Sequence, residues 1–248
     1  MNETSINTIF FDIGATLRVV VKDEAFSRAA EEELMQVVHA TTDHDTFFAA
    51  LEENWHKYRK NAKSSLLDVS EMELWTKWLL KDYPPTLIAK NASTLTRLWR
   101  DHDGRRVARP GVKETIIELY ERGYRLGIIA NTITEWEIPN WLVQDELVQY
   151  FQSVILSSKV RLRKPDPAIY LLAARTVGSL PENCAYIGDN ARRDVEGTFD
   201  AGYGMMIRII DPTRKQETAS TRHTPHHLIT EIPALLEIFP PLNSQKNT

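Results

Sequence analysis

The second half of the chain alternates short apolar runs with amphipathic segments, and this alternation limits the folds open to it. The apolar runs are continuous rather than alternating, as in strands that are buried on both faces. Strands separated by single helices predict a parallel sheet built from right-handed βαβ units, and therefore an α/β fold. The expected strands cover residues 124–130, 153–157, 184–188, 203–210 and 227–230, and the expected helices cover 112–122, 139–150, 168–177, about 191–201 and 232–239.

A further apolar strand lies near the N-terminus and ends in a single carboxylate. The run Thr8-Ile-Phe-Phe leads directly into Asp12, and a Gly-Ala-Thr turn follows. In a parallel sheet of this class, ligands bind at the carboxyl ends of the strands. Aspartate is also common in turns that have no function. This stretch alone is therefore compatible with a ligand-binding Asp12 and with one that only caps a turn.

Helical periodicity continues from Leu17 to about Arg100, and no strand is expected in this region. Four amphipathic helices are predicted, and the third opens with the capping box Ser70-Glu-Met-Glu73. Such helices form a bundle with its own core. We expect a core domain of residues 1–17 and 107–240, an inserted helical domain of residues 18–106 above the sheet edge, and a disordered tail at 241–248.

Composition excludes several classes of partner. The net charge of −4 gives no basic footprint for nucleic acid or an anionic membrane. No apolar run approaches the ~20 residues that a membrane helix needs, and the N-terminus lacks the basic region of a signal peptide. The single cysteine, Cys184, excludes an intrachain disulfide and is expected to be a small buried side chain. We expect a cytoplasmic protein, and the oligomeric state stays open.

Polar side chains follow several of the predicted strands. Each has a simple structural explanation: Asp189 or Asn190 could cap a helix, Lys164 could be a solvated loop lysine, and Asp194 could share an exposed helix face with Arg192 and Arg193. Because parallel strands end at one edge, we expect the set to meet in one crevice. This set comprises Asp12, Ala130-Asn131-Thr132, Lys164, Asp189 and Asp194.

Carboxylates that lie beside a lysine at such an edge are suited to a reaction at a phosphate group. Hard oxygen ligands favour Mg²⁺, which takes few protein ligands. A metal ion and an ammonium group neutralise the phosphate dianion that a carboxylate would otherwise repel. Aspartate is an established covalent nucleophile toward phosphorus.

The chain resembles the haloacid dehalogenase superfamily of hydrolases over nearly its whole length. The resemblance implies a Rossmann-like core, a helical cap inserted after the first motif, Mg²⁺, a small phosphorylated substrate and a phosphoaspartyl intermediate. The segments that carry it are Phe11-Asp12-Ile-Gly-Ala-Thr16-Leu17, Leu126-Gly-Ile-Ile-Ala-Asn131, Arg163-Lys164-Pro-Asp-Pro-Ala-Ile-Tyr170 and Tyr186-Ile-Gly-Asp189-Asn-Ala-Arg-Arg-Asp194.

The resemblance also implies a role for each matching residue. Asp12 would be the nucleophile and a metal ligand, with the Gly14 carbonyl and Asp189 as further ligands. Lys164 would hold the nucleophile and the phosphate, and Asp194 would support the lysine and the metal-bound waters.

Two positions depart from the pattern of the phosphatases in this superfamily. Those enzymes carry a second aspartate, the general acid and base, where this chain has Gly14. General acid–base groups contribute ~10²–10⁴-fold, so phosphate esters with poor leaving groups should suffer most. Ala130 stands where a serine or threonine usually precedes the phosphate-binding asparagine. The backbone of Asn131 or Thr132, or the Thr132 side chain, is expected to replace that hydroxyl contact.

The sequence leaves three activities open. The first is a Mg²⁺-dependent phosphohydrolase in which water or a side chain of the helical domain supplies the proton. His56, Arg59 and Lys60 are candidates, although a solvated helix face is the simpler interpretation of that cluster. The second is carbon–halogen or carbon–phosphorus hydrolysis, the latter through a Schiff base on one of the helical-domain lysines. The third is a non-catalytic protein that binds a phosphorylated ligand or a partner. The candidate lysines are Lys22, Lys57, Lys60 and Lys63.

Overall fold

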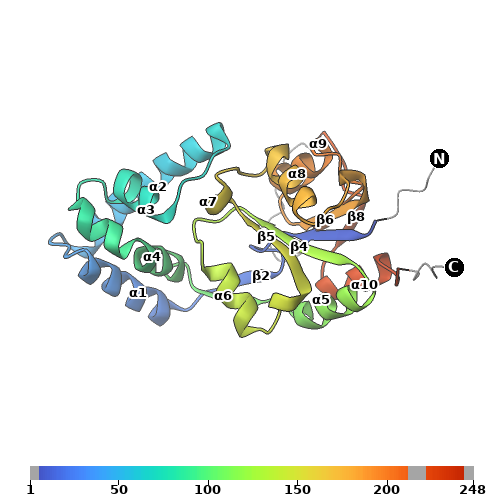
Figure 1. The fold of residues 1–248 in the computed structure, drawn as a ribbon. Helices are drawn as coiled ribbons and strands as arrows, with labels where there is room; N and C mark the ends of the chain where they lie inside the picture. Colours follow the sequence, from blue (N-terminus) through green and yellow to red (C-terminus); the bar gives the residue numbers. More distant parts are fainter. Residues whose placement is uncertain (1–5, 212–221, 243–248) are drawn as a thin grey trace.

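A six-stranded sheet forms the centre of the α/β part of the molecule, and a block of helices lies beside it (Figure 1). In the computed structural model, which describes residues 6–211 and 222–242, the strand order is β5-β4-β1-β6-β7-β8. Every pair of neighbouring strands is parallel. The prediction of an α/β fold with a parallel sheet is confirmed. The strands are β1 (Thr8–Phe11), β4 (Arg125–Ala130), β5 (Phe151–Leu156), β6 (Cys184–Gly188), β7 (Met205–Ile209) and β8 (His227–Ile229).

Helices cover both faces of this sheet, so the central strand is buried on both sides. Ile9 and Phe11 of β1 belong to one apolar cluster, and Phe10 belongs to the cluster on the opposite face. Figure 1 shows α5 and α10 on one side of the sheet and α8 and α9 on the other. The helices of the core are α5 (Val112–Glu121), α6 (Glu137–Gln144), α7 (Ser157–Val160), α8 (Pro167–Thr176), α9 (Gly197–Asp200) and α10 (Leu235–Ile238).

The block of helices between the first two core strands has its own apolar cluster, formed around Leu34, Tyr58, Trp75 and Leu95. All four predicted helical segments are present, and the Ser70 side chain caps the third by accepting the Glu73 N–H. They are α1 (Glu24–Val37), α2 (His44–Ser65), α3 (Glu71–Glu73), which continues into a π-helical segment at Leu74–Leu79, and α4 (Pro85–Asp101).

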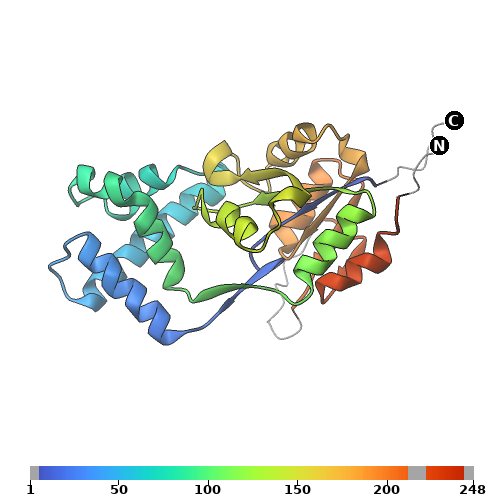
Figure 2. The ribbon, with the colours of Figure 1, turned by 60° about the horizontal axis from the view of Figure 1, so that its bottom comes forward.

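A two-stranded antiparallel ribbon joins this helical block to the core (Figure 2). It consists of β2 (Arg18–Val21) and β3 (Arg105–Ala108). The prediction that helix follows directly after Leu17 is therefore wrong. Three consecutive valines favour an extended strand, but the strand that pairs with them lies more than eighty residues away, so the local pattern did not reveal it.

The ends of some core helices also differ from those predicted. The helix expected over 139–150 ends at Gln144, because Glu146 adopts a left-handed conformation with φ 57°, and a separate 3-10 turn follows at Val148–Tyr150. The expected helix near 191–201 is a π-helical segment, Ala191–Glu196, followed by α9. The last expected helix is divided into a 3-10 turn at Ile232–Ala234 and α10.

The structure also bears on the expectations about membrane helices, the C-terminal tail and Cys184. Within the described residues, no helix is long and apolar enough to cross a membrane. Most of the expected tail, residues 243–248, lies outside the described part of the chain. Leu242 is described, and its N–H donates to the Arg122 carbonyl at 2.9 Å. Cys184 is buried at the start of β6, as expected.

Candidate active site

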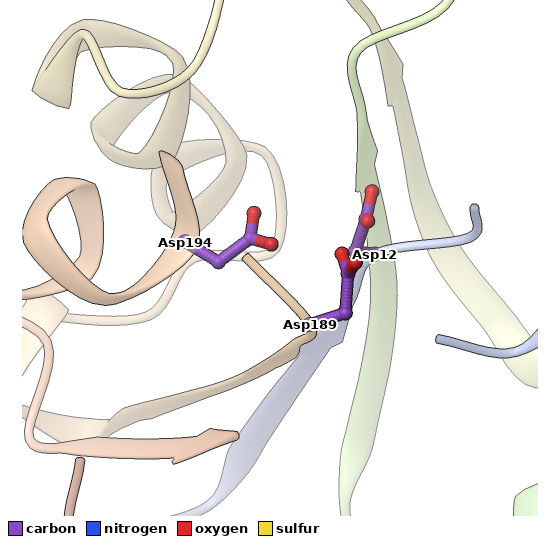
Figure 3. Close-up of side chains that lie close together, drawn as sticks. All are labelled: Asp12, Asp189 and Asp194. Atoms are coloured by element: carbon purple, nitrogen blue, oxygen red, sulfur yellow. The ribbon is translucent and has the colours of Figure 1, made fainter. Parts of the chain in front are cut away.

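Three carboxylates meet at the carboxyl edge of the sheet. Asp12 follows β1, Asp189 follows β6, and Asp194 lies in the π-helical turn that comes next. Each offers an oxygen within 4.8 Å of the others, and Figure 3 shows the Asp194 carboxylate directed toward the other two. The edge position follows from the parallel topology, because β1 and β6 are adjacent and end together.

Lys164 comes from the loop before α8 and binds two of these carboxylates. Its Nζ donates to Asp12 Oδ1 at 2.9 Å and to Asp194 Oδ1 at 2.8 Å, and it lies 2.5 Å from the Tyr186 hydroxyl. The lysine side chain is completely buried. Asn131 fixes its backbone, because its side-chain amide donates to the Lys164 carbonyl and accepts the Lys164 N–H, both at 2.9 Å.

Asp194 is a buried part of this cluster and does not lie on an exposed helix face. Its Oδ2 accepts the Asn190 N–H at 2.9 Å. Burial alone would raise the pKa of the Asp194 carboxyl, but Lys164 and Arg193 hold it below its ordinary value. Glycine at position 188 allows the Asp194 side chain to lie against the backbone at the end of β6, because a Cβ there would lie 2.6 Å from the Asp194 Cγ.

The remaining carboxylate atoms fit a hard cation. Asp12 Oδ2 is buried and has no hydrogen-bond partner. Burial, together with the charges of Asp194 and Asp12, raises the pKa of Asp189 to about 7. A bound cation would relieve this repulsion and satisfy the orphaned oxygen. Gly14, the third expected ligand, is exposed, and a Cβ there would meet no atom within 4 Å.

Arg193 is a site residue that the sequence analysis missed. Its Nη2 lies 3.2 Å from Asp189 Oδ1 and 3.7 Å from Asp12 Oδ2. Burial would lower the pKa of its guanidinium, but the three carboxylates raise it. The spacing in the sequence does indicate this contact, because Arg193 lies four residues after Asp189 and one helical turn brings the two side chains together. Tyr186 was also missed, although a hydroxyl within an apolar strand indicates a buried polar contact.

The turn after β4 satisfies its own hydrogen bonds. The Thr132 N–H donates to Ser157 Oγ at 3.0 Å, and the Thr132 hydroxyl accepts the Thr134 N–H at 3.1 Å. The Asn131 side chain is engaged with Lys164. In this structure, therefore, the side chains of both expected phosphate-binding residues make hydrogen bonds that orient the surrounding backbone.

A cavity of about 250 Å³ lies between the helical block and the core beside this cluster. Arg59 is the member of the predicted His56–Arg59–Lys60 group that lines it, whereas His56 binds the Glu52 carbonyl of its own helix. None of the four candidate Schiff-base lysines is among the described residues that line it. These are Trp55, Tyr58, Arg59, Trp99, Arg100, His102, Asp103, Asn131, Thr132, Ile133, Arg163 and Arg193.

The family is shown by a match along most of the chain. A family model for haloacid dehalogenase-like hydrolases matches residues 6–207. The chain belongs to this hydrolase family, and the predicted resemblance is confirmed.

Relatives in this family include several phosphatases. Glyceraldehyde 3-phosphate phosphatase from Pyrococcus furiosus is 28% identical over 246 residues, which cover 94% of this chain and 93% of that protein. Phosphoglycolate phosphatase from Salmonella typhimurium is 33% identical over 114 residues, which cover 42% of this chain and 44% of that protein. The chain spans less than half the length of several of the phosphatases it matches.

A solved structure shows the same fold over nearly the whole chain. The 2-haloacid dehalogenase from Pseudomonas syringae pv. Tomato DC3000 matches with a TM-score of 0.68 and covers 94% of this chain and 97% of that one. The identity is 18%, so this likeness concerns the fold alone.

Replacing Arg193 by methionine should tighten Mg²⁺ binding at the carboxylate cluster. Methionine fills similar space but removes a positive charge that lies 3.2 Å from Asp189 Oδ1. We expect a Kd lower by about tenfold in titration calorimetry, because a like charge opposes a second cation. Arg192→Met is the matched control, since Arg192 is exposed, and its affinity should equal that of the wild type. Equal or weaker binding in Arg193→Met would contradict a cation site among these carboxylates.

Proposed function

We propose that this protein is a Mg²⁺-dependent phosphohydrolase that acts through an aspartyl phosphate on Asp12. The observation that carries the proposal is the contact of buried Lys164 with Asp12 Oδ1 at 2.9 Å, which leaves Asp12 Oδ2 without a hydrogen-bond partner. One oxygen of the carboxylate is thereby held beside a positive charge, and the other is left to bind a metal ion.

The metal ligands in this proposal are the carboxylates of Asp12 and Asp189 and the carbonyl of Gly14. When bound, Mg²⁺ supplies positive charge that offsets the phosphate dianion. The three carboxylates face two cationic side chains, Lys164 and Arg193, so the cluster has an excess of negative charge for a metal to balance.

The residues of the chain would carry out the reaction in two steps. A carboxylate oxygen of Asp12 attacks phosphorus, and the bond from phosphorus to the leaving oxygen breaks. Water then attacks the phosphorus of the aspartyl phosphate, which releases inorganic phosphate and regenerates the Asp12 carboxylate. Throughout, Lys164 keeps a positive charge beside the nucleophile, and Asp194 and Tyr186 hold that lysine in position.

Residues 18–106 act as a cap domain in this account, and residues 1–17 and 107–240 form the catalytic core. Support comes from the cavity, to which the helical block contributes Trp55, Arg59 and Trp99 and the core contributes Asn131 and Arg193. Its volume of about 250 Å³ suits a small phosphorylated molecule. The named activities of the phosphatase relatives agree with such a substrate.

Substitution of Asp12 by asparagine tests the proposed function. Wild-type protein should release phosphate from members of a panel of phosphate esters and acyl phosphates only when Mg²⁺ is present. Asp12→Asn should release none, because the amide is not a nucleophile for phosphorus. Phosphonates and 2-haloacids are included in the panel. Turnover of a haloacid without metal would favour the dehalogenase alternative, and retained Mg²⁺ binding with no turnover of any substrate would favour a non-catalytic role.

Aspartate at position 14 should restore the missing general acid. The open space around the Gly14 Cβ position admits a side chain. We expect Gly14→Asp to raise kcat for alkyl phosphates by about 10²-fold, and to raise it much less for acyl phosphates, whose leaving groups need no proton. Gly14→Asn has the same size without the acid and should give no such gain. Equal rates for Gly14→Asp and Gly14→Asn would contradict this account of the proton donor.

A further inference from the structure

The cavity beside the carboxylate cluster has an excess of positive charge. Its lining includes Arg59, Arg100, Arg163 and Arg193, against one carboxylate, Asp103. Asp103 itself lies 3.2 Å from an arginine outside the lining. A phosphate bound at Asp12 and Lys164 would account for positive charge at that end of the cavity. It does not account for the arginines that come from the helical block.

Three of these arginines already have carboxylate partners in the protein. Arg100 donates to Glu137 at 2.9 Å, and Arg193 lies 3.2 Å from Asp189. Arg163 donates from one nitrogen to both oxygens of a buried carboxylate, Asp68, at 2.8 Å. These pairs hold their guanidinium groups in place, and they leave Arg59 as the arginine of the lining that has no salt bridge among the described residues.

Arg59 makes no ion pair with any residue in the part of the chain that the structure describes. Its guanidinium lies 5.5 Å from the centre of the Trp55 ring, which gives it a fixed platform. The Arg59 side chain is exposed overall, but partial burial lowers the pKa of its guanidinium, the charges of Arg163 and Arg193 lower it further, and those of Asp103 and Asp68 offset part of this shift. Like charges therefore converge on the cavity, and a bound anion would relieve their repulsion.

The residues that line the cavity come from two sides, so they would contact different ends of a bound ligand. Arg59 belongs to α2 of the helical block, whereas Asn131 and Arg193 line the same cavity from the core, next to Asp12 and Lys164. A molecule with its phosphate at the carboxylate cluster would direct its other end toward α2. The cavity of about 250 Å³ limits that molecule to a few carbon atoms between its ends.

We infer that Arg59 binds a second anionic group of the substrate, so that the preferred substrates are small phosphate monoesters that also carry a carboxylate or a second phosphate. The inference rests on the proposed function for the phosphate end of the ligand. It also predicts different affinities for the substrates named for two relatives. Phosphoglycolate has a carboxylate beside its phosphate, whereas glyceraldehyde 3-phosphate has a neutral aldehyde.

Calorimetry with the Asp12→Asn protein tests the inference without turnover. In the presence of Mg²⁺, phosphoglycolate should bind Asp12→Asn more tightly than glyceraldehyde 3-phosphate does. Adding Arg59→Gln should weaken phosphoglycolate binding by about tenfold or more, because a charge-assisted bidentate contact is lost. Binding of glyceraldehyde 3-phosphate should fall by less than about threefold, because the aldehyde makes no such contact. Arg59→Lys should keep part of the phosphoglycolate affinity.

Lys60→Gln is the matched control, since it removes a charge from the next residue of α2, which is exposed and outside the cavity. It should leave both affinities at the level of the Asp12→Asn parent. Equal weakening of the two ligands by Arg59→Gln, or no weakening of phosphoglycolate, would overturn the inference, as would failure of phosphoglycolate to bind the parent.

Phosphate release by the wild type is measured in a separate experiment. The phosphohydrolase activity and the anion site at Arg59 can therefore be rejected independently. Binding that depends on Arg59, in a protein that releases no phosphate from phosphoglycolate or any other ester, would support the anion site and reject the phosphohydrolase. Phosphate release from both esters, with equal losses in Arg59→Gln, would support the phosphohydrolase and reject the anion site.

Discussion

The buried ammonium group of Lys164 is the contact on which the rest of the site depends. Removing a charge of this kind from water costs several kcal/mol, and the cost is met only when the group is paired and hydrogen-bonded. Here the pairing is shared between Asp12 and Asp194, with the Tyr186 hydroxyl as a third contact. The lysine therefore fixes the relative positions of the ends of β1 and β6 and of the loop before α8.

The same loop also connects the site to the helical block. Arg163, the residue before Lys164, is held by Asp68 from the segment between α2 and α3. Backbone hydrogen bonds reinforce this contact, from the Arg163 N–H to Leu66 and from the Asp68 N–H to Arg161. The position of the helical block over the sheet edge is thus linked directly to the position of Lys164, and the cavity lies between the two parts.

Much of this arrangement could be predicted because parallel topology places strand ends together. The apolar runs before Asp12 and Asp189 identified the strands, and the βαβ order then required their carboxylates to meet at one edge. Arg193 and the β2–β3 ribbon could not be found in the same way. The first depends on the direction in which one helical turn presents its side chain, and the second on a pairing between distant segments. The cavity depends on how two separate apolar cores pack together, which no local pattern records.

In the proposed reaction Asp12 attacks phosphorus, and water then attacks the same phosphorus. Multiple turnovers in ¹⁸O-labelled water, followed by mass spectrometry of the released phosphate and of the peptide that contains Asp12, test it most directly. We expect one labelled oxygen in each phosphate and none in the Asp12 peptide. Label that accumulates in the Asp12 carboxylate would show that water attacks the aspartyl carbon, as expected for an ester intermediate formed on a carbon substrate, and would contradict the account.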